Sequence, residues 1–243
     1  MLTTLFGFMS GEISSMEFIT LVCVVTFVSA CCLPVHECAH AWMAEKLGDS
    51  TGRLSGRITL SPMAHLSWQG TLMLVLFGFG YAKPVPVNIR NFKKRKLYFG
   101  LTALAGPVSN LLMAIIFILV GTVFAIGEET NLIVLGTAGD MSISSIASSF
   151  FFNVGYYNVA LAVFNLIPFP PLDGSRILTM ILPDKIYYKI LGYERYLFYA
   201  LFALIFLFNR IGISPIGSIS QSIFIGIVSV CRILLSLIFG IFN

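Results

Sequence analysis

The chemically most informative residues are two histidines four positions apart, His36 and His40, with Glu37 directly after the first. Residues i and i+4 of a helix lie on one face, so both imidazoles can bind the same zinc ion. Glu37 can then act as a general base toward a water molecule on that zinc. The spacing therefore predicts the metal site of a zinc protease.

These ionisable residues lie in a stretch, about residues 18–47, that is otherwise apolar enough for a membrane helix. A charged side chain at the centre of such a helix costs about 2.5–3.5 kcal/mol on insertion scales, so it usually has a function. The stretch from Phe18 to His36 rises by about 27 Å in an α-helix, and the hydrocarbon core is about 30 Å thick. We expect the histidine pair near one edge of the membrane, where water reaches it.

The composition is that of an integral membrane protein. Of the 243 residues, 57% are hydrophobic and 11% are charged, whereas a soluble domain has about 25% charged residues. The apolar runs are long and unbroken, which favours helices over a β-barrel. We expect an all-α polytopic fold with about five transmembrane helices in a single domain, residues 1–243. The expected spans are about residues 18–47, 98–126, 146–167, 196–208 and 216–242.

The region between the first two spans is not expected to form a membrane-spanning helix. Residues 53–60 are expected to form a strand. Residues 71–81 are apolar but too short to cross a bilayer, so they suit a re-entrant or short β segment. An extended edge there could pair with an unwound substrate segment by strand addition.

Charge placement predicts the orientation. Nine of the fifteen Lys and Arg residues lie between positions 46 and 96, and the positive-inside rule places that region in the cytosol. The active site is then on the cytosolic side. The basic run at residues 93–96 is expected to set topology and to attract anionic lipid. Nucleic acid is not an expected partner, because no recognition module surrounds this run.

A catalytic zinc usually has three protein ligands and one open position, and Asp173 is the best candidate for the third. It follows Pro168, Pro170 and Pro171, which cannot continue a regular helix and can turn a carboxylate inward. Gly174 permits tight backbone geometry beside it. The alternative is that Asp173 merely caps the next helix.

Together, the run at residues 36–40 and the run at 165–174, Asn-Leu-Ile-Pro-Phe-Pro-Pro-Leu-Asp-Gly, resemble the site-2 protease family of intramembrane metalloproteases. Residues 82–88 and 105–110 are similar to that family's small bacterial members, which implies a bacterial cell membrane. The resemblance covers about residues 18–185 and implies a catalytic core of three helices. Residues 196–242 would add C-terminal helices. No PDZ domain is evident.

The resemblance also implies roles for five residues. His36, His40 and Asp173 would bind one zinc ion per chain, and Glu37 would activate water. Asn165 matches an asparagine that faces the active site, where its amide can stabilise an oxyanion or hold the substrate backbone. The alternative for Asn165 is a contact between helices. The expected partners are the lipid bilayer and a membrane-protein substrate, cut in a transmembrane or membrane-associated segment.

Three other functions are the alternatives for this chain. A metal transporter would need further ligand stations along the membrane, and the later spans offer almost none. An inactive scaffold would not need all four catalytic positions. A prenyl-protein endopeptidase would more naturally use a glutamate as third ligand. His65 is expected to be an ordinary polar loop residue, with a role near the substrate as the alternative. The oligomeric state stays open.

Overall fold

The structure, a computed structural model, describes residues 10–11, 13–68, 70, 82–130, 132–133, 135–138, 141–210 and 214–239. The described part is almost wholly helical, with one pair of two-residue antiparallel strands. The longer elements are α2 (Ser15–Phe27), η1 (Val28–Cys32), α3 (Leu33–Lys46), α7 (Arg95–Glu129), α8 (Ile143–Leu166), α11 (Glu194–Arg210) and α12 (Pro215–Phe239). The shorter ones are α4 (Thr51–Leu54), α5 (Pro62–His65), η2 (Ile89–Asn91), β1 (Thr137–Ala138), β2 (Met141–Ser142), α9 (Asp173–Ile177), η3 (Leu178–Met180) and α10 (Asp184–Leu191).

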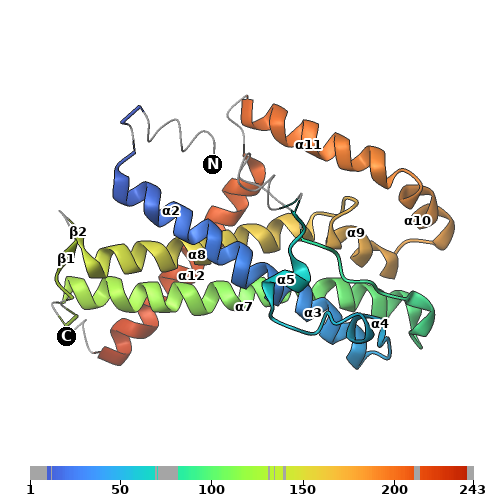
Figure 1. Cartoon of the computed structure of the whole chain (residues 1–243), viewed down its shortest axis with the longest axis horizontal. Coiled ribbons are helices and arrows are strands. Elements are labelled where there is room, and N and C mark those ends of the chain that lie inside the picture. The colour runs from blue at the N-terminus through green and yellow to red at the C-terminus, as the bar shows by residue number, and fades with distance from the viewer. Residues whose placement is uncertain are drawn as a thin grey trace.

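The first span is one continuous rod made of α2, η1 and α3 (Figure 1). Its start is set by a capping box, in which Ser14 and Glu17 bond each other's backbone N–H groups. The rod contains one π-helical turn, η1, directly before the helix that carries the histidines. It ends at Lys46, two residues before Gly48, whose φ of +107° favours glycine.

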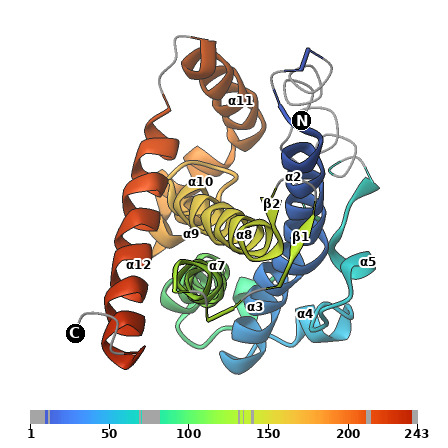
Figure 2. The same ribbon diagram turned by 90° about the vertical axis from the view of Figure 1, so that its left-hand side faces the viewer.

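The centre of the molecule is the antiparallel pair α7 and α8, with α12 on one side and the first rod on the other (Figure 2). One buried cluster joins α7, α8 and α12 through Ala114, Ile118, Val159 and Cys231. A second joins the first rod to α8. The end of α3 and the start of α7 lie together with α9 at one end of the bundle (Figure 1).

Four helical segments of the described chain are long and apolar enough to cross a membrane. They are Ser15–Lys46, Arg95–Glu129, Ile143–Leu166 and Pro215–Ile238. The remaining expected span corresponds to α11, which has only 17 residues, so a count of five spans stays a prediction. An ion pair between Arg232 and Glu129 joins α12 to the last turn of α7.

The prediction of a strand at residues 53–60 is wrong. The helix α4 covers Thr51–Leu54 instead, and turns follow it. Two hydrogen bonds stand at the start of this helix. The Oδ1 atom of Asp49 accepts both, one from the backbone N–H and one from the hydroxyl of Thr51. Residues 71–81, the expected re-entrant segment, lie outside the described residues. Beside them, Leu66 and Ala82 form an isolated antiparallel bridge.

The segment directly after α3 is joined to the residues around η2 by Asp49, which is fully buried. Besides Thr51, its carboxylate accepts the Asn88 N–H at 2.7 Å and the Asn91 side-chain amide at 2.7 Å. Burial raises the pKa of Asp49, but the hydrogen bonds from Thr51, Asn88 and Asn91 outweigh it and lower the pKa below its usual range. Asp49 therefore stabilises the fold as a carboxylate.

This stabilisation is present at neutral pH and is lost as the pH falls through the lowered pKa of Asp49. We expect Asp49→Asn to lose about 2 kcal/mol of stability at pH 7, the size of a hydrogen bond to a charged group. The difference from wild type should shrink below about pH 4, where the carboxyl protonates in the unfolded chain. Thermal unfolding in detergent from pH 7 to pH 3 measures it. A difference that stays constant with pH would contradict this assignment.

Candidate metal centre

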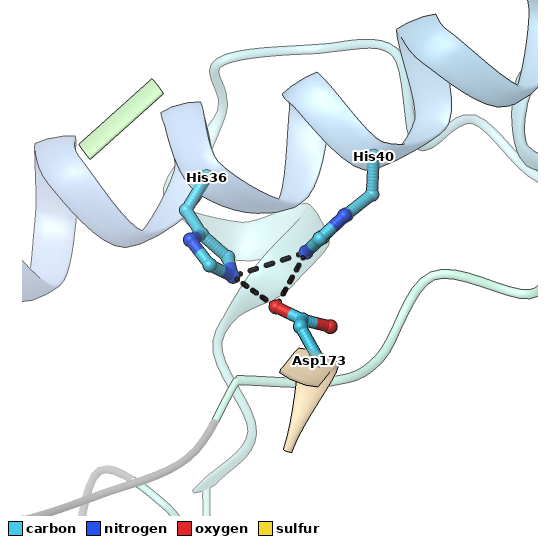
Figure 3. A group of neighbouring side chains, drawn as sticks. All are labelled: His36, His40 and Asp173. Carbon is cyan, nitrogen blue, oxygen red and sulfur yellow. Dashed lines mark hydrogen bonds and ion pairs between the residues drawn. The ribbon is translucent and has the colours of Figure 1, made fainter. Parts of the chain in front are cut away.

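The two histidines lie on one face of α3, as their spacing predicts. Both are buried, and their Nε2 atoms are 3.0 Å apart (Figure 3). The rings are nearly perpendicular, at 88°. Both ring edges are thus turned toward the same point between α3 and α9.

Asp173 reaches that point from the segment that follows α8. The helix α8 stops at Leu166, and the chain runs through the prolines before α9 begins at Asp173. Its Oδ2 lies 3.3 Å from Nε2 of His36 and 3.1 Å from Nε2 of His40. The N-cap of α9 is Leu172, so the alternative role of Asp173 as the capping residue does not apply.

The three ligand atoms fit a tetrahedral metal centre. With metal–ligand bonds of about 2.0–2.1 Å, two ligands of such a centre lie about 3.3 Å apart. The observed separations are 3.0, 3.1 and 3.3 Å. Two imidazole nitrogens and one carboxylate oxygen are also a donor set that zinc accepts, with a fourth position left for water or substrate. Within the described residues, these three form the one group with this geometry.

A face of α7 closes the centre from the side. The backbone carbonyl of Thr102 accepts the Nδ1–H of His40 at 2.7 Å, which leaves Nε2 unprotonated and available as a ligand. One turn later, a Cβ atom on Gly106 would lie 2.3 Å from Nε2 of His40 and 2.6 Å from Cε1 of His36. Only glycine leaves room for both rings here. Thr102 accepts this hydrogen bond with its backbone carbonyl, so its residue type gave no signal for this role in the sequence.

The other two predicted site residues are not in the ligand group. Glu37 is partly exposed beside it and interacts electrostatically with His40. No hydrogen bond or ion pair among the described residues engages its carboxylate. Asn165 is in the last turn of α8, where its amide donates to the Leu161 carbonyl at 3.0 Å. A catalytic role for either residue stays a prediction.

His65 is fully buried, so the expectation of an ordinary polar loop residue is wrong. Its Nε2 lies 2.8 Å from the Thr59 carbonyl and holds the turn before α5. Arg57 supports the same region by donating to the carbonyls of Ala64 and Lys83. These contacts identify His65 as part of the internal support of the segment that follows α3.

The turn that presents Asp173 depends on Gly174. A Cβ atom there would lie 2.3 Å from the Leu166 carbonyl oxygen and 2.4 Å from that of Ile167. Because these obstacles are backbone atoms, Gly174→Ala is expected to displace Asp173 and to reduce zinc binding by about 100-fold, as for loss of a ligand-orienting contact. Zinc content after dialysis measures this. Gly226→Ala on α12, where nothing lies within 4 Å, is the matched control. Full zinc content in Gly174→Ala would contradict the expectation.

The comparisons with known proteins agree with one another. The model of peptidase family M50 matches residues 24–208. A Bacillus subtilis protein named "Putative zinc metalloprotease YwhC" is 38% identical over 213 residues, which are 87% of this chain and 87% of that protein. A Mycolicibacterium smegmatis protein named "Putative zinc metalloprotease Rip2" is 27% identical over 147 residues, 58% of this chain and 51% of that protein. No solved structure matches the chain with significance.

Proposed function

This chain belongs to peptidase family M50 and is a zinc metalloprotease of the membrane, and we propose that it is an endopeptidase that cuts inside the bilayer. The substrates are transmembrane or membrane-associated segments of other proteins. The observation that supports this best is the convergence of His36, His40 and Asp173 between apolar helices. A metal site between these helices supports hydrolysis at membrane depth.

In the proposed reaction, His36, His40 and Asp173 hold one zinc ion per chain. When bound, zinc supplies Lewis-acid polarisation of the peptide carbonyl and lowers the pKa of water. Glu37 removes a proton from the attacking water and delivers it to the leaving amine. Asn165 donates its amide to the developing oxyanion, which requires it to exchange its present bond to the Leu161 carbonyl.

The proposed orientation places the site on the cytosolic side of a bacterial cell membrane. The site lies at the bundle end where α3 finishes and α7 begins, and nine of the fifteen Lys and Arg residues lie from the last residue of α3 to the first turn of α7. Under the positive-inside rule this end is cytosolic. The first rod, α7 and α8 form the catalytic core, and α11 and α12 extend the same single domain.

Metal transport is the main alternative function. A transporter needs successive metal-binding sites along the membrane. The described side chains contain one group that could bind a metal ion, and it lies near one end of the bundle. Its three ligands are buried and lie against α7. This arrangement supports a resident metal ion over a transported one.

The proposal is tested with cells of a deletion strain that express either the wild type or Asp173→Ala. Membrane proteomes of the two strains are compared by mass spectrometry. We expect one or more membrane proteins to accumulate uncut in the variant and to be cut within or beside an apolar segment in the wild type. Identical proteomes, together with zinc flux by the purified wild type in proteoliposomes, would overturn the proposal in favour of transport.

A further inference from the structure

The two metal-binding rings differ in how their second nitrogen is held. Nδ1 of His40 has the Thr102 carbonyl as its partner at 2.7 Å. Nδ1 of His36 is buried and has none, and it is turned away from Asp173 (Figure 3). A metal-bound histidine almost always donates its other ring N–H to an acceptor that fixes the ring. His36 therefore lacks a contact that its neighbour has.

We propose that Asn110 is the positioning residue for His36, with Asn158 behind it. Asn110 is fully buried in α7, and neither its Oδ1 nor its Nδ2 has a partner. No direct bond joins the two residues, and Asn110 Oδ1 accepts the His36 Nδ1–H through one bridging water. The proposal rests on the proposed function, because it concerns the same zinc site.

The register of α7 supports this assignment. Thr102, Gly106 and Asn110 are spaced by four residues and lie on one helix face. Thr102 holds His40, and Gly106 packs against both rings. Since α3 and α7 run in opposite directions at their contact (Figure 1), the next turn of α7 lies beyond Gly106 on the His36 side. Asn110 occupies that turn.

Asn158 of α8 lies at the same level. Its Nδ2 donates to the Val154 carbonyl at 2.8 Å and lies 3.3 Å from Sγ of Cys32, one turn before His36. Gly155, three residues earlier in α8, packs against Ala114, one turn after Asn110 in α7. Because α7 and α8 are antiparallel, Asn110 and Asn158 lie on facing surfaces.

The partnerless atoms in this region are complementary. There are two donors, Nδ1–H of His36 and Nδ2 of Asn110, and two acceptors, Oδ1 of Asn110 and Oδ1 of Asn158. Linked in order through bridging waters, His36 donates toward Asn110 and Asn110 donates toward Asn158, and each group gains one partner. Buried polar groups are rarely left without partners, so a chain that pairs all four accounts for two asparagines in an apolar interior.

The test measures zinc affinity of the purified full chain in detergent by competition with a chromophoric chelator. Asn110→Leu keeps the branched shape and removes the acceptor, and we expect zinc binding to weaken 10- to 100-fold. Asn110→Asp keeps an acceptor oxygen and should stay within about threefold of wild type. Ser109→Ala, which removes only a bond to the Gly106 carbonyl, is the control. Asn110→Ala replaces Asn110→Leu if the larger side chain prevents folding.

A second readout separates positioning from simple structural support. The helical circular-dichroism signal of the zinc-free Asn110→Leu protein should match that of zinc-free wild type, because the helices keep their backbone hydrogen bonds when the Asn110 amide is lost. The cobalt-substituted protein should show an altered visible absorption spectrum. Wild-type zinc affinity in Asn110→Leu would overturn the assignment of Asn110 as a positioning residue and leave the proposed function unaffected. Absence of zinc binding by the wild type would overturn the proposed function and this inference with it.

Discussion

Glu37→Gln is expected to abolish proteolysis while leaving zinc bound. Glutamine has nearly the same size but cannot accept a proton from water, so the loss should be about 100- to 10,000-fold, the usual contribution of a general base. The ligands His36, His40 and Asp173 stay in place, since no contact among the described residues depends on the Glu37 carboxylate. Cleavage of a reconstituted membrane substrate and zinc content are measured on the same preparation.

The control for this variant is Glu45→Gln in the same helix. Glu45 forms an ion pair with Arg53 at 3.0 Å, away from the ligand group, and its loss should leave cleavage within about twofold, because such a partly exposed pair contributes little. Wild-type cleavage by Glu37→Gln would exclude it as the general base. Loss of zinc from Glu37→Gln would show that its carboxylate supports the metal instead.

Gly106→Ala is expected to weaken zinc binding by more than about 100-fold, beyond the range for loss of an outer contact. The added methyl group would lie 2.3 Å from Nε2 of His40 and 2.6 Å from Cε1 of His36, well inside van der Waals contact. The rings and α7 cannot all keep their positions. Zinc affinity by chelator competition measures the effect, and cleavage should fall in parallel.

Gly226→Ala serves again as the control, because it adds the same methyl group to a membrane helix where nothing lies within 4 Å. Helicity by circular dichroism is recorded for both variants. Retained helicity with lost zinc in Gly106→Ala locates the damage at the metal centre. Full zinc affinity in Gly106→Ala would show that α7 does not pack on the ligands as described.

Several features follow from the sequence because they are local. The i, i+4 spacing places His36 and His40 on one face of any helix, and the apolar run around them requires that helix in a membrane. The prolines after Leu166 end α8, since proline lacks the N–H that a helix needs. The change from helix to turn before Asp173 was therefore predictable from residue types alone.

Other features depend on contacts between distant segments. The Thr59–His65 bond and the burial of His65 come from packing of the segment after α3. The helix α4 stands where a strand was predicted, directly after Asp49, whose carboxylate accepts hydrogen bonds from Thr51 and from the distant Asn88 and Asn91. Residue preferences over short windows carry no information about such partners.

Residue types and spacing were enough to predict the membrane class, the histidine pair with its adjacent glutamate, and the aspartate as the best third ligand. Helix packing was needed to learn that the Asp173 oxygen lies within 3.3 Å of both rings, that the Thr102 carbonyl holds His40, and that Gly106 gives the rings their space. The difference lies in the range of the interactions. Helix periodicity and proline chemistry act within one turn, whereas the ligand group forms only where α3, α7 and α9 pack together.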